Sequence, residues 1–112
     1  MPSMTTYQPG DFLLLAFPFG DGTRSKNRPA LVLIDTGDQD VLLARVTTQV
    51  YSTPHDVTLH EWRQAGLIAA SWVRLHKLAT VEKSLVRRYL GHIQASDRQH
   101  VAAVLNGMFG SW

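Results

Sequence analysis

The sequence contains no cysteine, and none of its apolar runs approaches the ~20 residues that a membrane-spanning helix needs. Without cysteine there are no disulfides, no thiolate zinc sites and no cysteine nucleophiles. The stretch from Met1 to Thr6 lacks the basic region followed by an apolar segment that marks a secretion signal. We therefore expect a soluble cytoplasmic protein that makes no contact with a membrane.

Neither sign of charge dominates the chain, which has 11 Lys and Arg against 9 Asp and Glu. The two halves differ, however, because residues 1–60 hold four basic and six acidic residues, whereas residues 61–112 hold seven and three. The second half is therefore the part that we expect to attract a polyanion. Basic residues also serve simply to solvate a surface, so charge alone leaves both interpretations open.

Apolar residues occur in short β-prone segments bounded by turn signals. With 112 residues and 45% hydrophobic content, the chain has room for one core, so we expect one domain over residues 1–112 with a flexible tail at 1–8. The segments predict five strands: Asp11–Phe19, Ala30–Ile34, Val41–Thr48, Asp56–Leu59 and Ser71–Val81. Thr23–Asn27 is expected as a basic loop, and Pro29, which lacks an N–H donor, as the first residue of the second strand. Leu85–Ile93 fits either a strand or a helix.

One helix is predicted near the C-terminus, with Ser96 as its N-cap and Gly110 as its end. Its apolar residues recur at helical spacing: Val101, Val104, Leu105 and Met108. A single helical turn is expected at His60–Gly66. Several short strands and one terminal helix predict a mostly β (α+β) protein, a small and strongly curved β-barrel packed on a helix. An open α+β sheet is the alternative.

Short motifs follow one another in a fixed order along nearly the whole chain. They are Gly10-Asp11, Phe17-Pro18-Phe19, Arg28-Pro29-Ala30-Leu31-Val32-Leu33, Val46-Thr47-Thr48, Asp56-Val57, Ala65-Gly66-Leu67, Ser71-Trp72-Val73-Arg74 and Lys77-Leu78. Each is weak by itself, but their order and spacing from Gly10 to about Phe109 resemble the PemK/MazF family of bacterial toxins. The resemblance implies an SH3-like or CcdB-like barrel with a C-terminal helix. It also implies a homodimer that acts as a sequence-specific, metal-independent endoribonuclease.

The resemblance further implies partners and catalytic residues. The partners are single-stranded RNA and a cognate acidic antitoxin, and operator DNA would be contacted only through the antitoxin complex. The family's catalytic Arg before the Pro-Ala step matches Arg28, its catalytic Thr in the third strand matches Thr47, and a second Arg, important in one branch, matches Arg74. That branch has an acidic residue two positions later, where this sequence has His76.

These residue types suit RNA cleavage by the RNA's own 2′-hydroxyl. The reaction needs a proton acceptor, a donor for the leaving oxygen and positive charge at the phosphorane, but no metal. Arg28 can supply charge and paired hydrogen bonds to phosphate oxygens, unless it only pairs with Asp21 or Asp11 on the surface. Thr47 is expected to orient the phosphate or the 2′-hydroxyl, although Thr is also a common strand residue. The imidazole of His76 is expected to transfer protons.

Substrate contacts are expected from five further residues: Lys26, Thr48, Gln49, Trp72 and Phe19. If the segment around Trp72 is extended, strand alternation places Trp72, Arg74 and His76 on one face, where the indole would stack on a base. The alternative is that Trp72 belongs to the core or to a dimer interface. The other histidines have no carboxylate partners at ligand spacing, so we expect neither a metal nor another cofactor.

Three functions remain open at this stage. The first is a growth-inhibiting endoribonuclease toxin that leaves a 2′,3′-cyclic phosphate and a 5′-hydroxyl. The second is a non-catalytic poison or binding module that resembles CcdB and acts on DNA gyrase. The third is a degenerate relative retained for partner binding. Arg28 together with Thr47 favours the nuclease.

Overall fold

The computed structural model describes residues 5–18 and 25–112, so Phe19 and Asp21 lie outside the described residues. The elements in chain order are β1 (Asp11–Pro18), β2 (Ser25–Ile34), β3 (Asp40–Thr47), β4 (Asp56–Leu59), β5 (Ser71–Glu82), the 3-10 turn η1 (Lys83–Leu85), β6 (Val86–His92) and α1 (Ala95–Phe109). The ambiguous segment at Leu85–Ile93 is therefore mainly strand. Within the described ranges, no helix is long and apolar enough to cross a membrane.

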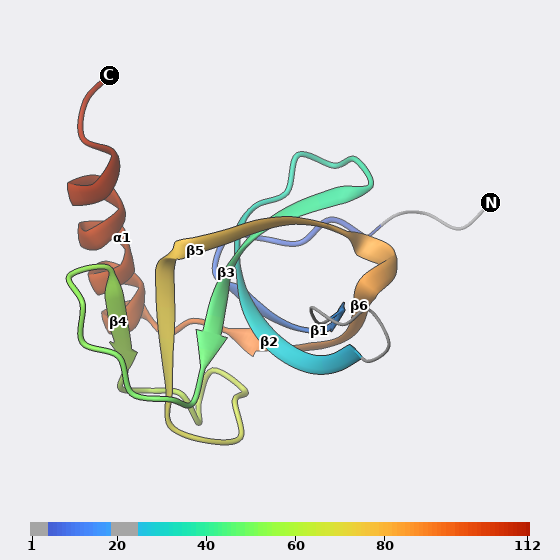
Figure 1. Cartoon of the computed structure of the whole chain (residues 1–112), viewed down its shortest axis with the longest axis horizontal. Helices are drawn as coiled ribbons and strands as arrows, with labels where there is room; N and C mark the ends of the chain where they lie inside the picture. Colours follow the sequence, from blue (N-terminus) through green and yellow to red (C-terminus); the bar gives the residue numbers. More distant parts are fainter. Residues whose placement is uncertain (1–4, 19–24) are drawn as a thin grey trace.

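The six strands form one antiparallel sheet in the order β4-β5-β3-β2-β1-β6. Figure 1 shows that the sheet curls round on itself, while α1 stands beside β4 at one end. The end strands β4 and β6 do not pair with each other in the described part of the chain, so the barrel is not closed. The predicted fold class, a curved and mostly β sheet with one C-terminal helix, is confirmed.

β5 bends sharply partway along its pairing with β3. The register moves from Ala44 opposite Leu78 directly to Arg45 opposite Arg74, so the segment 75–77 of β5 has no opposing residues on β3. Such irregularities bend a strand and turn side chains in new directions. The bend lies at the corner of β5 that is visible in Figure 1, and it separates the barrel from the end that carries β4 and α1.

The core has two parts that meet along the central strands. The helix-side core consists of Phe12, Leu31, Ala44, Val46, Val57, Leu59, Ala65, Leu67, Val73, Leu75, Ile93 and Val101. The barrel core consists of Leu13, Leu15, Ala30, Val32, Val41, Leu43 and Val81. Neighbouring residues such as Phe12 and Leu13 thus enter different cores, and both faces of β1 are buried. This explains why β1 and β2 contain unbroken apolar runs instead of alternating patterns.

β2 is longer than predicted, because it begins at Ser25 instead of Ala30. Pro29 therefore lies inside the strand and not at its first position, which corrects the expectation. Its register partner on β1 is Leu14, whereas pairing with β3 begins only at Ala30 opposite Arg45. At Pro29 the strand has a partner on one side only, and a residue without an N–H donor is tolerated at such an edge.

The start of α1 also differs from the prediction. Gln94 is the N-cap residue and Ser96 is not, because the Ser96 hydroxyl instead contacts Oε2 of Glu61 at 3.2 Å. The buried carboxylate of Asp97 accepts the backbone N–H groups of His60 and Glu61 at 3.1 and 2.9 Å. These contacts attach the turn after β4 to the helix. The predicted apolar face is confirmed, since the four spaced residues all lie in or against the helix-side core.

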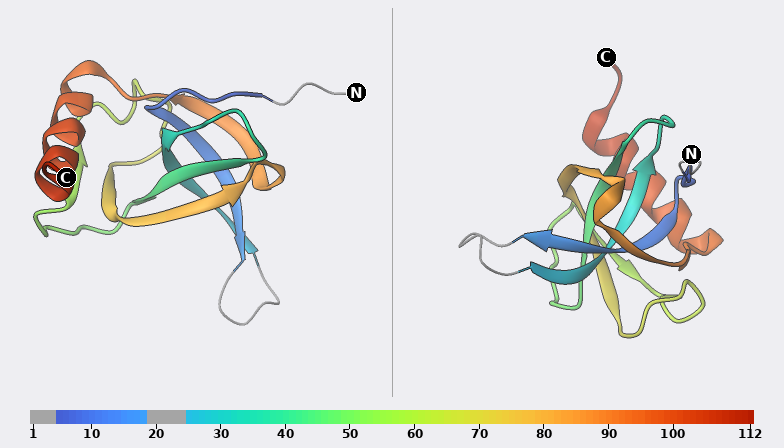
Figure 2. Two further views of the ribbon diagram at one scale, coloured as in Figure 1. Left: turned by 90° about the horizontal axis from the view of Figure 1, so that it is seen from above. Right: turned by 90° about the vertical axis from the view of Figure 1, so that its right-hand side faces the viewer.

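The turn at 60–66 approaches β6 unusually closely. Gly66 has φ +94°, a conformation that residues with a side chain rarely adopt. A Cβ atom on Gly91 of β6 would overlap the carbonyl group of Ala65. In the right-hand view of Figure 2 the turn region lies below the curled sheet. The two glycines therefore allow backbone to pack directly on backbone.

The chain is held in place before β1 begins. The backbone N–H of Tyr7 donates to Asp35 at 2.7 Å, and that of Gln8 donates to Asp11 at 2.8 Å. Tyr7 also packs against the barrel core. The end of the predicted flexible tail is thus anchored, while residues 1–4 lie outside the described ranges.

Candidate active site

Arg28 and Thr47 line one pocket of about 240 Å³ between β2 and β3. The complete lining is Lys26, Asn27, Arg28, Pro29, Val46, Thr47 and Thr48. Four of the predicted site residues therefore meet here. The lining is basic or uncharged throughout, which suits a phosphate group. We call this hollow the Arg28–Thr47 pocket.

The two principal residues of this pocket differ in exposure. The Arg28 side chain is half-buried, whereas Thr47 is buried and only 7% exposed. Thr47 is fixed at the end of β3, and its Oγ1 accepts the backbone N–H of Gln49 at 3.1 Å. Trp72 is opposite Thr47 in the register and half-buried. The pocket thus combines a cation with a fixed hydroxyl.

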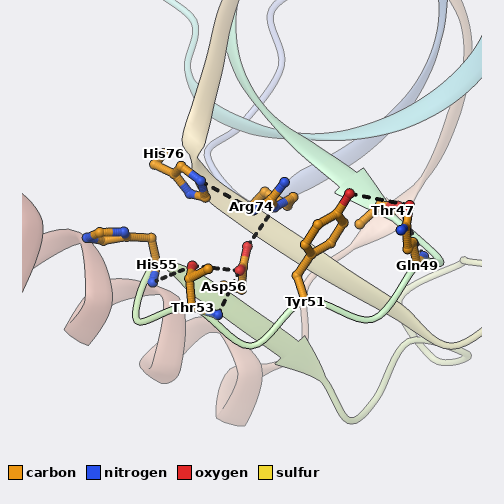
Figure 3. Close-up of polar contacts among 8 residues, drawn as sticks. All are labelled: Thr47, Gln49, Tyr51, Thr53, His55, Asp56, Arg74 and His76. Carbon is orange, nitrogen blue, oxygen red and sulfur yellow. Dashed lines mark hydrogen bonds and ion pairs between the residues drawn. The ribbon is translucent and has the colours of Figure 1, made fainter.

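Arg74 lies in a second, closed group of side chains shown in Figure 3. It is 8% exposed, and its Nε donates to Oδ1 of Asp56 at 2.9 Å. The Tyr51 ring covers the guanidinium, with 3.5 Å from the ring centroid to Cζ of Arg74. Asp56 also accepts the Thr53 hydroxyl at 2.6 Å. Burial alone would raise the pKa of Asp56, but hydrogen bonds from Thr53 and Arg74 and the charge of Arg74 outweigh it and lower that pKa.

His76 belongs to this second group. Its Nε2 lies 3.4 Å from a terminal nitrogen of Arg74, and its ring centroid is 5.3 Å from that of His55. A guanidinium has no acceptor, so Nε2 must accept this contact and the proton resides on Nδ1. Nδ1 is buried, with no hydrogen-bond partner among the described residues. Burial and the charge of Arg74 together lower the pKa of His76, and the geometry therefore favours a neutral imidazole.

A chain of contacts joins the pocket to the Arg74 group. The backbone of Gln49 contacts Thr47, the Tyr51 hydroxyl donates to Oε1 of Gln49 at 3.3 Å, and the Tyr51 ring stacks on Arg74. Figure 3 shows these residues in succession along the segment that leaves β3. Neither Arg74 nor His76 lines the Arg28–Thr47 pocket. The two groups are therefore separate but connected.

Strand alternation on β5 follows the expectation as far as the bend. Val73 and Leu75 enter the helix-side core, while Arg74 and His76 contact each other on the opposite face. Sequence reasoning did not assign a role to Asp56 or Tyr51. Asp56 carried a usable signal, because a carboxylate that opens an edge strand is well placed to pair with an Arg on the neighbouring strand. The register does place Asp56 opposite Arg74.

Comparisons with known proteins agree with this architecture. The family model described as PemK-like, MazF-like toxin of type II toxin-antitoxin system matches residues 8–109. An endoribonuclease in complex with its cognate antitoxin from a Mycobacterial species is similar, with 18% identity, a TM-score of 0.74 and coverage of 92% of this chain and 95% of that chain. The Mycobacterium tuberculosis toxin MazF-mt6 has 22% identity and a TM-score of 0.69, covering 89% and 99%.

A MazE-MazF structure from Deinococcus radiodurans is also similar, with 20% identity, a TM-score of 0.76 and coverage of 96% and 100%. No curated protein matches the sequence. Because the family model covers nearly the whole chain, the chain belongs to the PemK-like, MazF-like toxin family of type II toxin-antitoxin systems.

Proposed function

We propose that this protein is an endoribonuclease toxin that cleaves single-stranded RNA without a metal ion. The observation that carries the proposal is the Arg28–Thr47 pocket, where a guanidinium and a fixed hydroxyl meet among basic and uncharged residues. The 2′-hydroxyl of the RNA loses its proton and attacks the adjacent phosphorus, the bond to the 5′-oxygen breaks, and that oxygen takes up a proton to become a hydroxyl. The products carry a 2′,3′-cyclic phosphate and a 5′-hydroxyl.

Each pocket residue has a role that follows from its chemistry. Arg28 donates to the non-bridging oxygens and stabilises the charge that develops on the phosphorane. Thr47 and Thr48 orient the phosphate or the attacking hydroxyl. Lys26 attracts a neighbouring phosphate, and Gln49, which follows the pocket in the chain, contacts the RNA. Trp72 offers a ring for base stacking.

His76 is the proposed proton acceptor. Its lowered pKa keeps the imidazole neutral near pH 7, which is the form that takes up a proton. The acceptor atom Nε2 is engaged by Arg74, so proton uptake requires His76 to exchange this contact for the substrate. Arg74 contacts the proton acceptor directly and is connected to the pocket only through Tyr51 and Gln49 among the described residues.

The proposal includes partners. An acidic antitoxin would complement the basic second half of the chain, and its binding segment would fold on contact. The protein is proposed to act as a homodimer and to reach operator DNA only through the antitoxin complex.

The direct test incubates purified protein with a long single-stranded RNA in excess EDTA. Cleavage is expected to persist, to leave cyclic phosphate ends, and to stop at a site that carries a single 2′-deoxy residue. For substitutions of Arg28, the matched control is Arg88→Gln, because Arg88 is exposed and lies outside the pocket lining. Loss of cutting in EDTA with recovery in magnesium would contradict the metal-free reaction. Inhibition of DNA gyrase without RNA cleavage would favour the CcdB-like alternative.

A further inference from the structure

A second and larger hollow adjoins the Arg28–Thr47 pocket. It has a volume of about 320 Å³, within the range typical of small-ligand sites, roughly 300–1,000 Å³. Arg28 lines both hollows, and the strands β2 and β3 contribute to both. We call this second hollow the Leu78 pocket. A single strand of RNA whose phosphate is bound by Arg28 would therefore have this pocket immediately beside it.

The lining of the Leu78 pocket combines apolar surface with positive charge. Five of its residues are apolar, namely Ala30, Leu43, Ala44, Leu78 and Ala79, and the other three are Arg28, Arg45 and Lys77. Leu78 is a large apolar side chain that remains 38% exposed on β5. No carboxylate lines either pocket in the described part of the chain. The surface thus suits a flat, weakly polar group carried on an anionic backbone.

We propose that the Leu78 pocket binds the base of the nucleotide next to the cleaved phosphate and so contributes to the choice of cleavage sequence. The inference rests on the proposed RNA substrate. The exposed side chains of Leu78 and Ala79 contact the face of the base, while Arg45 and Lys77 are available to base edges and to the following phosphate. Arg28 connects base binding with cleavage, because it lines the Leu78 pocket and is also proposed to bind the reacting phosphate.

Charge complementarity decides between occupants. A nucleotide offers both parts that the lining requires, a planar ring and a phosphate, within one residue of a continuous strand. A second copy of this chain would have to bring acidic surface to three cations, yet the chain as a whole has a net charge of +2. An acidic antitoxin segment would have to supply the two parts from separate residues, an apolar side chain for the floor of the pocket and carboxylates for the three cations.

The first test maps cleavage sites on a long RNA of random sequence. Ala79→Phe fills the pocket, and Thr80→Phe, the next residue on the same strand, is the control because it lines neither pocket. Wild type is expected to prefer one base beside the cut. Ala79→Phe is expected to cut those sites at least about tenfold more slowly and to lose the preference, in keeping with the contribution of one stacked base. Thr80→Phe is expected to retain both. Melting temperatures verify that each variant is folded.

A second test does not depend on cleavage or on the folding of Ala79→Phe. Short oligonucleotides of adenosine, cytidine or uridine are added to the labelled wild-type protein, and the amide signals of residues 77–79 are followed by NMR. At least one oligonucleotide is expected to shift these signals. Lys77→Gln is expected to reduce the slope of the logarithm of the binding constant against the logarithm of the salt concentration by about one unit. Arg88→Gln is expected to leave the signals of residues 77–79 unchanged.

The outcomes separate this inference from the proposed function. If wild type cuts no RNA but the amides of 77–79 respond to an oligonucleotide, the nuclease proposal fails and the Leu78 pocket stands as a nucleotide-binding site without a role in cleavage. If folded Ala79→Phe cuts with unchanged rate and preference, the base pocket is wrong and the nuclease stands. If Ala79→Phe forms a smaller assembly in sedimentation, the pocket belongs to the contact with a second copy. If Ala79→Phe loses only the binding of the antitoxin, the pocket belongs to the antitoxin. Either result would overturn the inference.

Discussion

Arg28 and Arg74 lie on the two strands that flank β3, yet their surroundings are opposite. Arg28 is half-buried and faces a hollow lined by two threonine hydroxyls, the amide of Asn27 and the cation of Lys26. Arg74 is buried against a carboxylate and beneath an aromatic ring. A guanidinium that lines an open, basic pocket suits an incoming anion, and one that is buried against an aspartate organises its neighbours. The contrast supports the proposal that Arg28 binds phosphate and that Arg74 positions its neighbours.

Removing Asp56 tests the closed side of this contrast and has the largest expected effect. Asp56→Ala leaves a buried guanidinium without its counter-charge, which costs about 3–5 kcal/mol of stability. Thermal or urea unfolding measures the loss. Asp38→Ala is a matched control, because Asp38 is exposed and its carboxylate accepts a backbone N–H, that of Asp40, on the surface. Equal stability of the two variants would contradict a structural role for the Arg74–Asp56 pair.

Removing Arg28 tests the open side. Arg28→Ala is expected to lower the cleavage rate by about 10²-fold or more, as when a preorganised charge is removed from a transition state. Arg28→Lys should recover little, since an ammonium cannot reproduce the planar fork. Circular dichroism should show an unchanged fold. Near wild-type cleavage by Arg28→Ala would mean that the pocket is not where the reaction occurs.

The pH dependence of cleavage and of stability tests His76. Because its pKa is lowered in the folded protein, the unfolded chain takes up the proton first as the pH falls below the ordinary value of ~6.5. Stability contributed by the neutral imidazole is therefore complete above that value and declines below it. The rate is expected to bend in the same acidic window. The pH dependence of stability and that of the cleavage rate should both weaken in His76→Gln. If the pH–rate profile of His76→Gln equals that of wild type, His76 has a structural role only.

Tyr51 gives the smallest expected effect, because it acts only through Arg74 and Gln49. Tyr51→Ala removes the ring from the guanidinium and is expected to slow cleavage several-fold, in line with a cation–π contact of roughly 1–2 kcal/mol. Tyr51→Phe keeps the ring, loses the contact with Gln49, and should change the rate by less than about threefold. If Tyr51→Phe slowed cleavage more than Tyr51→Ala, the hydrogen bond to Gln49, and not the stacking on Arg74, would connect the two groups.

The strands and the C-terminal helix were predictable because their signals are local, and the shared pocket of Arg28 and Thr47 agrees with the family resemblance. The structure differs from the sequence-based predictions where residues distant in the sequence determine the local contacts. Ser96 has the chemistry of a cap, but Glu61 lies close enough to contact its hydroxyl instead. Pro29 is tolerated inside β2 because β3 has not yet joined the strand. His76 lies in the bend of β5, within the segment that has no opposing residues on β3, and no spacing of residues in the sequence indicates that bend.

The close packing of Gly91 against the 60–66 turn suggests how the activity of this member of a toxin family could be made dependent on temperature in cells. Gly91 lies outside both pockets, and a single added methyl group there meets fixed backbone that cannot easily give way. Gly91→Ala is thus a natural starting point for a heat-sensitive allele, in which cells would tolerate the gene at a warm restrictive temperature and lose growth after a shift to the cold. Such an allele would allow selection of suppressors, antitoxins or RNA targets in living cultures without altering the residues proposed to act on RNA.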